Sequence, residues 1–513
     1  MKIFTDNEKY FSEIRELFTM LTGDKDVSVE SFHENAGYKD VRLDSFLDDV
    51  AGENSSAEIQ VDEYLTDNTE KSNFSDFPSI YITLTKCGQE YTAQCFENGK
   101  LIFEDFTQKN NDEKEKNAYK RLLFSVVKNS FADIRDNWGI LTGIRPVKIV
   151  NNLKKCGKQP SEIVETLKKN YLISDEKIRL ITRISHNQAR AIKQLSGGIS
   201  IYIFIPFCPS RCYYCSFYSN DISVSGKLIE PYLDALEKEI GEVLSLDYFK
   251  DKKISSIYVG GGTPSSLDEK NLARLLDIIN KNFDTKSISE FTFEAGRADT
   301  LSRNKLQIIK DGGANRLCIN PQTMNDDTLS KIKRTHTSDD FEKVFCEARE
   351  VGFDNINSDL ILGLYDEDED DMRYSLKRLM SLEPENITLH TLSEKRKSYL
   401  AQNSIKISDF DISLLLNELS KTLFEKSYEP YYLYRQKNMI GSAENVGFAR
   451  QGKICLYNIA MMDEVQSVIG FGAGASTKTV DKDLVTRVPN YKDVILYSKN
   501  IDKMISKKKE VLI

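Results

Sequence analysis

The sequence predicts an α/β protein built around a partial (βα)6 parallel barrel between residues 199 and 395. Two features of this range carry the prediction. Short apolar strands alternate with helices of 3–4 apolar spacing, which is typical of parallel sheets. Glycine-rich, cysteine-rich or polar strings follow directly after several of the strands. Because the carboxyl ends of barrel strands meet at one face, we expect the chemistry to gather there.

The length of the chain requires more than the barrel. Its 513 residues exceed one ordinary domain of ~150 residues. Shifts in composition divide it into an N-terminal α+β domain, a helical segment, the barrel and a C-terminal α+β extension that is expected to cover the substrate. The predicted ranges are 1–110, 111–198, 199–395 and 396–513.

The charge and the hydrophobic pattern narrow the classes of function. The net charge is −9 and the pI is about 5.4, which argues against general binding to nucleic acid. No apolar run approaches the ~20 residues of a membrane span, and the acidic N-terminus lacks the pattern of a signal peptide. Six of the 9 cysteines are scattered, as in a reducing compartment. A cytoplasmic protein is therefore expected.

Before the barrel, the sequence predicts one small sheet among helices. A helical rhythm runs from Tyr10 to Leu21. Residues 78–107 alternate apolar and polar positions around two turn signals, which predicts an antiparallel sheet or hairpin. From about 112 to 197 the spacing is helical again, interrupted by a glycine-containing loop at 138–146.

The barrel elements follow in strict alternation. The strands are expected in the strings ISIYIFIPF, SSIYVGGG, EFTFEA, RLCIN, NINSDLIL and NITLHTL. The helices between them are expected at 228–246, 269–282, 302–311, 339–351 and 369–381. After the barrel, a helix is expected at 411–426, followed by strands around EPYYLYRQ and the glycine-rich string FGAGAST.

Three cysteines lie close together on the loop that follows the first barrel strand. Cys208, Cys212 and Cys215 have the spacing CxxxCxxC. Thiolates are soft ligands that suit iron–sulfur clusters or zinc. Structural zinc commonly takes four ligands from paired CxxC units, and the sequence offers no second pair. The loop therefore predicts a 4Fe–4S cluster in which one iron is left to bind the amine and carboxylate of a small molecule.

Polar residues at the ends of later strands predict a ligand pocket at the same face. The string YVGGGTP at 258–264 closes the second strand, and glycines allow a backbone to approach a ligand closely. Glu294, Gln322 and Asp359 belong to the next three strands, and Arg334 comes soon after Gln322. Each of them alone fits a turn, a helix cap or a structural partner. Together at one barrel end they favour a ligand.

This combination resembles the radical SAM superfamily, and within it the oxygen-independent coproporphyrinogen III oxidase group. The match is good over residues 200–395. Further strings are similar to the HemZ-type branch, called coproporphyrinogen dehydrogenase: WGILTGIRP, EAGR, INPQTMND, LHTL, YYLYRQKNM, ENVGFA and CLYNI. The resemblance implies a barrel of radical SAM type with a 4Fe–4S cluster and S-adenosylmethionine (SAM) as cofactors. It implies that the reduced cluster cleaves SAM to methionine and a 5′-deoxyadenosyl radical.

The resemblance also implies a set of SAM contacts and a reaction. The contacts would be Tyr202, Tyr214, Gly261, Gly262, Thr263, Glu294, Gln322, Arg334, Asp359 and Ser393. The implied reaction belongs to haem biosynthesis: two propionates of coproporphyrinogen III become vinyl groups with loss of carbon dioxide, which gives protoporphyrinogen IX. A low-potential donor such as flavodoxin or ferredoxin would supply the electron.

A tetracarboxylate substrate needs cations, and several follow the barrel strands. Arg435 and Lys437 are candidates in YLYRQKNM, and Lys395 and Arg396 follow LHTLSE. Each of them could equally be an ordinary solvated charge, since such residues are mostly exposed.

Two departures from the family leave further functions open. Phe204 stands at the family's usual histidine, and Phe217 stands where the well-studied oxidases carry a fourth cysteine. Haem chaperones of a related branch share that phenylalanine but usually carry an HNxxYW string, which this chain lacks. The missing string favours the enzyme. A different radical SAM reaction on a tetrapyrrole and a zinc-binding interaction protein also stay open.

Overall fold

The computed structural model describes most of the chain and divides it into two compact units. The described residues are 1–31, 80–109, 113–132, 134–143, 145–393, 410–436, 439–481 and 484–512. Unit 1 comprises Met1–Thr142 and Gln159–Ile178, and unit 2 comprises Gly143–Lys158 and Arg179–Ile513. The boundaries of the four ranges predicted from the sequence stay a prediction.

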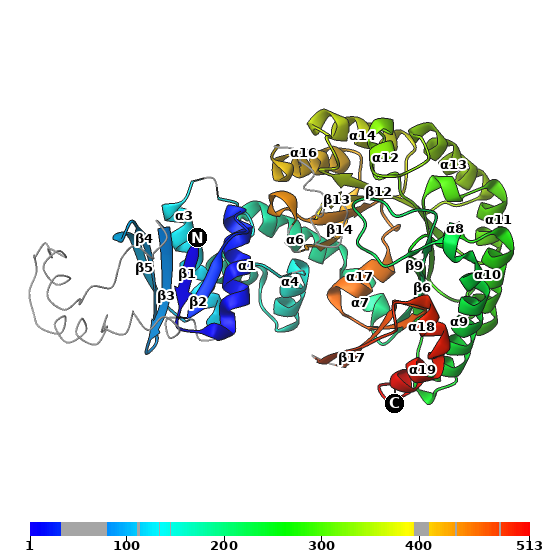
Figure 1. Ribbon diagram of the computed structural model, residues 1–513, viewed down its shortest axis with the longest axis horizontal. Coiled ribbons are helices and arrows are strands. Elements are labelled where there is room, and N and C mark those ends of the chain that lie inside the picture. Colours follow the sequence, from blue (N-terminus) through cyan, green and yellow to red (C-terminus); the bar gives the residue numbers. More distant parts are fainter. Residues whose placement is uncertain are drawn as a thin grey trace, which may run out of the picture. The chain divides into compact units, whose positions relative to one another are not determined.

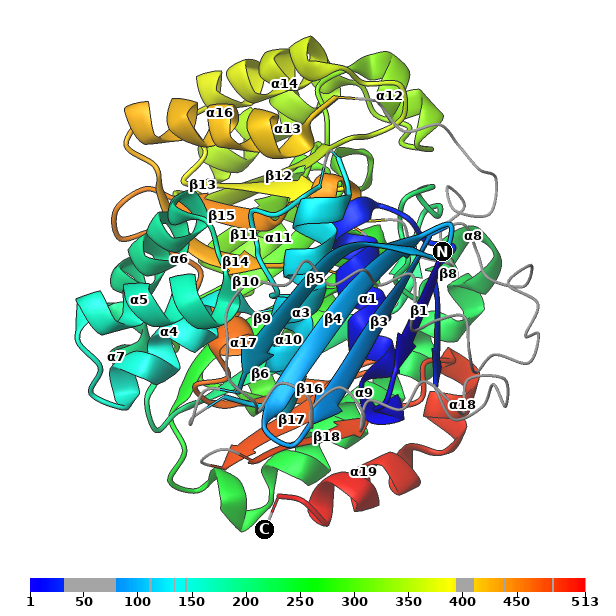
Figure 2. The same cartoon turned by 90° about the vertical axis from the view of Figure 1, so that its left-hand side faces the viewer.

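Unit 1 is a five-stranded sheet with helices on one face. The strand order is β2-β1-β3-β4-β5, and Figure 2 shows α1 and α3 running along the sheet. The predicted hairpin is confirmed, because β3, β4 and β5 form an antiparallel meander. Two short strands that the sequence did not predict, β1 and β2, add parallel partners to its edge. The elements are β1 (Lys2–Thr5), α1 (Phe11–Thr22), β2 (Ser28–Ser31), β3 (Ile80–Cys87), β4 (Glu90–Glu97), β5 (Lys100–Gln108), α3 (Glu115–Ser130) and α5 (Pro160–Tyr171).

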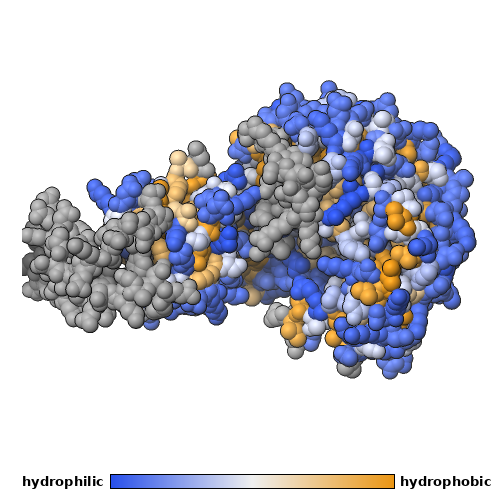
Figure 3. Space-filling view, in the orientation of Figure 1, coloured by the Kyte–Doolittle hydropathy of each residue, from blue (hydrophilic) through white to orange (hydrophobic). Residues whose placement is uncertain are grey.

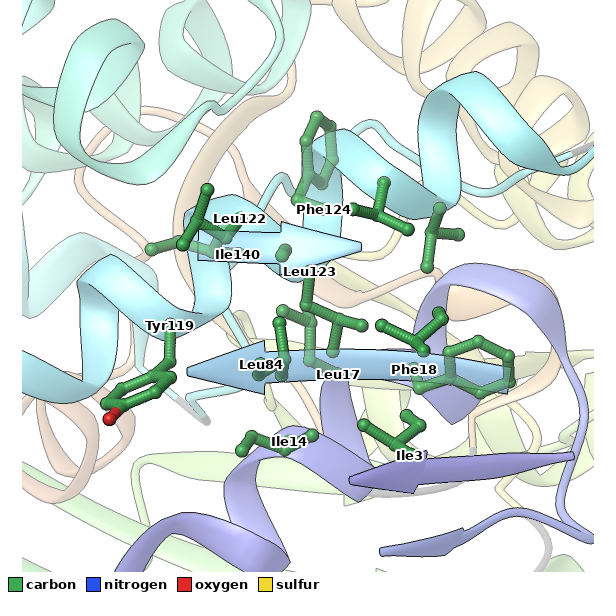
Figure 4. Packing of buried hydrophobic residues seen from close by; sticks show 14 of the residues in the cluster. Ile3, Ile14, Leu17, Phe18, Leu84, Tyr119, Leu122, Leu123, Phe124 and Ile140 are labelled. Atoms are coloured by element: carbon green, nitrogen blue, oxygen red, sulfur yellow. The ribbon is translucent and has the colours of Figure 1, made fainter. Parts of the chain in front are cut away.

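The core of unit 1 lies between this sheet and its helices. Helix α1 buries Ile14, Leu17 and Phe18 on one face, with the 3–4 spacing that predicted it. Figure 4 shows these side chains close to Leu84 of β3 and Leu123 of α3. All five are almost completely buried, which is the packing expected of a single hydrophobic core.

Unit 2 contains the predicted barrel, and its six parallel strands are confirmed. Each strand pairs in parallel with the next one along the chain, in the order expected of repeated βα units. The strands are β6 (Ile199–Ile205), β9 (Ile254–Gly261), β10 (Glu290–Gly296), β11 (Arg316–Ile319), β12 (Ile356–Leu362) and β13 (Asn386–Thr391). The helices between them are α8 (Ile222–Ser225), α9 (Ile229–Leu244), α10 (Glu269–Asn282), α11 (Arg303–Asp311), α12 (Asp326–Lys331), α13 (Ser338–Val351) and α14 (Glu369–Ser381).

These helices cover the outside of the parallel strands (Figure 1). Helix α10 illustrates the cause: it buries Leu272, Leu275 and Ile279 on one face, and Asp268 caps its first turn by accepting from the Asn271 amide. The outward faces are mainly hydrophilic (Figure 3). Within the described ranges, no helix is long and apolar enough to cross a membrane.

The C-terminal strands complete the barrel sheet at both edges. The full order is β14-β15-β13-β12-β11-β10-β9-β6-β16-β17-β18. Strand β15 is antiparallel to β13, whereas β16 is parallel to β6. The strands are β14 (Glu429–Tyr434), β15 (Asn445–Ala449), β16 (Ser467–Phe471), β17 (Ser476–Asp481) and β18 (Leu484–Pro489). The remaining helices are α4 (Pro146–Lys155), α6 (Asp175–Asn187), α7 (Ala189–Leu195), α16 (Ile412–Glu425), α17 (Leu456–Asp463), α18 (Val494–Lys499) and α19 (Ile501–Lys509).

Candidate functional site

The three clustered cysteines lie on the loop at the carboxyl end of β6. Cys208 ends the short strand β7 (Phe207–Cys208), which pairs with β8 (Asn220–Asp221), and the Cys215 amide donates to the Cys212 carbonyl at 3.0 Å. All three thiols are free, and burial raises the pKa of Cys215 to about 11. In the described part of the chain, no three His, Cys, Asp or Glu side chains converge as they would around one metal ion. The cysteines of a 4Fe–4S cluster need not converge on one point, because each thiolate binds a separate iron atom.

The glycine loop after β9 packs directly against the cysteine loop. The Gly262 amide donates to the Ile205 carbonyl at 2.8 Å, and the Thr263 amide donates to the Phe207 carbonyl at 2.7 Å. A Cβ on Gly262 would lie 2.5 Å from the Phe207 carbonyl oxygen, and one on Gly261 would lie 2.9 Å from the ring of Phe204. A ligand contact was predicted for these glycines. The structure shows that their open sides face the chain itself, so any SAM contact they make stays a prediction.

Two side chains donate to the cysteine sulfurs. The Thr263 hydroxyl lies 3.5 Å from Cys208 Sγ. Arg297, directly after β10, places Nη1 3.6 Å from Cys212 Sγ. Hydrogen bonds to thiolate sulfurs are a normal part of iron–sulfur sites, where they stabilise the negative charge. Arg297 belongs to the string EAGR, but no role was predicted for it from the sequence.

A pair of partly buried acids, Glu294 and Asp359, lies on strands β10 and β12. Asp359 of β12 accepts from the Asn357 amide at 2.8 Å, and its Oδ2 lies 3.5 Å from Nε2 of His390 on β13. Burial opposes ionisation of Asp359, but His390 and Asn357 outweigh it and hold its pKa below the usual value. Burial, followed by the charge of Asp359, raises the pKa of Glu294 to about 7. Near neutrality Asp359 is therefore ionised, whereas Glu294 is about half protonated.

The raised pKa of Glu294 predicts a pH-dependent stability of the unliganded protein. Its folded pKa of about 7 lies above the ordinary 4.5, so its contribution is complete below pH ~4.5 and is lost as the pH rises through ~7. Glu294→Gln cannot titrate. We therefore expect its Tm, relative to the unsubstituted chain, to rise between about pH 5.5 and 8, by the equivalent of roughly 2 kcal/mol. The exposed-site variant Glu350→Gln is the control, and a Tm difference that is constant with pH would contradict the expectation.

Three buried polar atoms gather after β11 without a partner. They are Asn320 Oδ1, Gln322 Oε1 and Arg334 Nε, and the described chain offers none of them a hydrogen bond. Gln322 has a φ of +73°, and its amide donates to the Asp359 carbonyl at 2.9 Å. Arg334 donates to the Tyr214 hydroxyl at 3.0 Å, so the cysteine loop is fixed to this strand end. Unpartnered buried polar atoms are uncommon in native proteins, and this cluster suits a small polar ligand.

Stacked tyrosines line the barrel below these groups. The ring centroid of Tyr202 lies 5.7 Å from that of Tyr457, and Tyr457 lies 4.6 Å from Tyr258. Tyr457 comes from α17, so a C-terminal helix contributes to the barrel interior. On the neighbouring strands, the Tyr434 hydroxyl lies 3.2 Å from Nδ1 of His390. Only Tyr202 among these five was predicted from the sequence as a site residue. The others lie in strings that the sequence analysis singled out, but no role was predicted for them.

The remaining predicted residues are less closely tied to this site. Ser393 follows β13 and forms a bridge to Met439. Arg435 is buried, and its Nη2 donates to the Ser442 carbonyl at 3.1 Å, whereas a substrate cation was expected there. Its role toward substrate stays a prediction. Lys437, together with Lys395 and Arg396, lies outside the described residues.

A parallel half-barrel whose first strand leads into a CxxxCxxC loop defines the class of this protein as a radical SAM protein, and the Radical SAM superfamily model matches residues 202–379. A relative from Bacillus subtilis, the "Oxygen-independent coproporphyrinogen-III oxidase-like protein HemZ", is 36% identical over 415 residues, which cover 79% of this chain and 83% of the relative. The chain therefore belongs to the HemZ-type family of oxygen-independent coproporphyrinogen-III oxidase-like proteins.

The chain is also similar to relatives of other description. The B. subtilis "Heme chaperone HemW" is 35% identical over 305 residues, covering 58% of this chain and 76% of the relative. Among solved structures, coproporphyrinogen III oxidase (HemN) from Escherichia coli aligns with a TM-score of 0.49 and 23% identity, over 63% of this chain and 73% of that one. Relatives of this chain are thus described both as coproporphyrinogen-III oxidase-like and as haem chaperones.

Proposed function

We propose that the protein is a radical SAM enzyme that oxidatively decarboxylates coproporphyrinogen III to protoporphyrinogen IX, without oxygen. The observation that carries the proposal is the meeting of three free thiols with unpartnered strand-end polar atoms at one barrel face. A cluster bound by Cys208, Cys212 and Cys215 fits the first group. An amino acid-bearing nucleoside fits the second, because it offers both donors and acceptors.

The residues around this face have separate tasks in the proposal. When bound, the cluster and SAM would supply a carbon-centred radical that removes a hydrogen atom from a propionate side chain, which then loses carbon dioxide and passes one electron to an external electron acceptor. Gln322 and Arg334 would bind the polar groups of SAM with the buried atoms that lack partners. Glu294 and Asp359 would accept hydrogen bonds from its hydroxyl or amino groups, and Asp359 is already ionised for this task.

The tetrapyrrole assignment rests on the family rather than on the barrel face. The HemZ relative supports a coproporphyrinogen-type substrate, and the aromatic lining of Tyr202, Tyr258 and Tyr457 suits a flat, mainly apolar ring system. Arg435 and Lys437 are proposed partners for its propionates. A low-potential protein such as flavodoxin or ferredoxin would deliver the electron that reduces the cluster.

The test is an anaerobic incubation of the reconstituted full chain with SAM, dithionite and coproporphyrinogen III. The proposal expects vinyl products and 5′-deoxyadenosine to appear together, measured by liquid chromatography and mass spectrometry. Deoxyadenosine without vinyl product would keep the radical chemistry and reject this substrate. A chain that binds haem tightly but forms neither product would be a chaperone, and one that retains only zinc would be neither.

A further inference from the structure

Arg297 is a buried cation in contact with the cysteine loop. It is 3% exposed, and its Nη1 lies 3.6 Å from Cys212 Sγ and 2.9 Å from Ser210 Oγ, with a longer contact of 3.4 Å to the Ser210 carbonyl. One guanidinium edge thus reaches a predicted cluster ligand and the backbone of the same loop.

Asp299 holds the other edge of this guanidinium. Arg297 Nε and Nη2 donate to the two carboxylate oxygens at 2.9 and 2.6 Å, a bidentate fork that fixes the plane of the group. Asp299 in turn accepts from the Thr335 hydroxyl and lies 3.7 Å from His336 Nδ1. Arg297 is therefore preorganised toward the sulfur, and its charge persists at every pH at which the protein is folded.

Two buried cations and one carboxylate lie beside the cysteine loop. Arg297 and Arg334 are both buried there, and Asp299 contacts Arg297 alone of the two. Reduction of a cluster bound by three thiolates adds one electron and no proton, so negative charge increases next to these cations. In a buried site, where the effective dielectric constant is low, a fixed charge at contact distance strongly favours the more negative state. The potential of an iron–sulfur cluster responds to net charge and to hydrogen bonds on its sulfurs.

We propose that Arg297 sets the reduction potential of the cluster, by placing a fixed cation against the Cys212 thiolate so that a low-potential donor can reduce it. The inference rests on the proposed function, because it requires the cluster, but it does not depend on which tetrapyrrole is the substrate. Arg297 is a positioning and charge-tuning residue: it touches a ligand of the cluster and not the reacting atoms.

The test is a redox titration of the anaerobically reconstituted full chain without SAM. The cluster is poised with dithionite and mediator dyes, and the reduced form is followed by electron paramagnetic resonance. In Arg297→Gln the equilibrium constant for one-electron reduction of the cluster should fall at least about tenfold. That corresponds to a reduction potential lower by about 59 mV. Asp299→Asn leaves the cation uncompensated and should shift the potential the opposite way. The double variant should lie between the two single variants.

A matched control removes the same kind of ion pair elsewhere in the barrel wall. Arg349 makes a bidentate pair with Glu385, which precedes β13 and so lies at the amino ends of the strands. Arg349→Gln should leave the potential unchanged. If the Arg297 and Asp299 variants stay within the range of this control, the inference is overturned and the proposed function stands. If the unsubstituted chain takes up no cluster, both are overturned. If Arg297→Gln binds too little iron to titrate, Asp299→Asn decides: a raised potential supports the inference and an unchanged one overturns it.

Discussion

Replacing Cys212 with alanine should leave a folded protein that neither retains iron nor forms product. Cys212 is the buried member of the three, and its Sγ accepts a hydrogen bond from Arg297. Mutating a residue that only hydrogen-bonds a metal ligand typically costs about 10–100-fold in metal affinity or activity. Loss of the ligand itself should therefore reduce 5′-deoxyadenosine formation by more than ~100-fold. Iron analysis after reconstitution, together with the anaerobic assay, measures both effects.

The chain supplies its own control for this substitution. Cys346 is exposed on α13, away from the carboxyl ends of the strands, so Cys346→Ala removes a thiol without touching the loop. We expect its iron content and product formation to match those of the unsubstituted chain. A Cys212→Ala protein that retains iron and makes deoxyadenosine at the same rate would rule out the proposed ligand set. Unchanged circular dichroism of both variants shows that the comparison concerns the site and not folding.

Local sequence pattern was sufficient for the barrel because each strand and the helix that follows it are close together in the sequence. The strings of β6, β9 and β12 have the apolar runs of buried parallel strands, and every predicted helix between them lies within two residues of its observed bounds. The positions of β15 and β16, beside β13 and β6, had no such signal. Each pairs with a strand that is distant in sequence, and such pairing depends on tertiary packing rather than on local pattern.

The candidate site was predictable to the same extent. Spacing alone identified the cysteine loop, and strand ends identified Glu294 and Asp359. Arg297 was not predicted, because its partner Cys212 is 85 residues distant in the sequence and the string EAGR does not indicate the contact. The sequence predicted a ligand contact for the glycines. The structure adds a second reason for glycine at position 262, because a side chain there would collide with the Phe207 carbonyl.

The largest loss of stability is expected from a buried ion pair between α9 and the C-terminal helix α19. Glu239 and Lys508 are both completely buried and 2.6 Å apart. The Glu239 carboxylate also accepts from the Gly472 amide at 2.9 Å, the Asn490 amide at 2.8 Å and the Tyr497 hydroxyl at 2.7 Å. Removing one partner leaves the other charge buried without a counter-charge. Glu239→Gln and Lys508→Met should therefore each lower the free energy of unfolding by about 3–5 kcal/mol, measured by thermal unfolding.

An exposed pair on the same two helices provides the comparison. Lys238 and Asp502 lie 2.6 Å apart, with 45% and 78% of their side chains exposed. Lys238→Met should therefore cost less than about 1 kcal/mol. The double variant Glu239→Gln/Lys508→Met should cost clearly less than the two single variants together, because neither charge is left unpaired. Additive losses, or single variants as stable as Lys238→Met, would mean that the pair is not coupled.

This ion pair is also linked, through Gly472, to the strand β6 that leads into the cysteine loop. Glu239 fixes Gly472, where a Cβ would lie only 2.5 Å from the Phe204 carbonyl oxygen, and Tyr232 donates to that same carbonyl. Phe204 lies on β6, four residues before Cys208. Loosening the Gly472 turn frees the end of β6, so Glu239→Gln should retain less iron than Lys238→Met after identical reconstitution. Equal iron content with a lowered Tm would show that the C-terminal helices stabilise the barrel without positioning its cysteine loop.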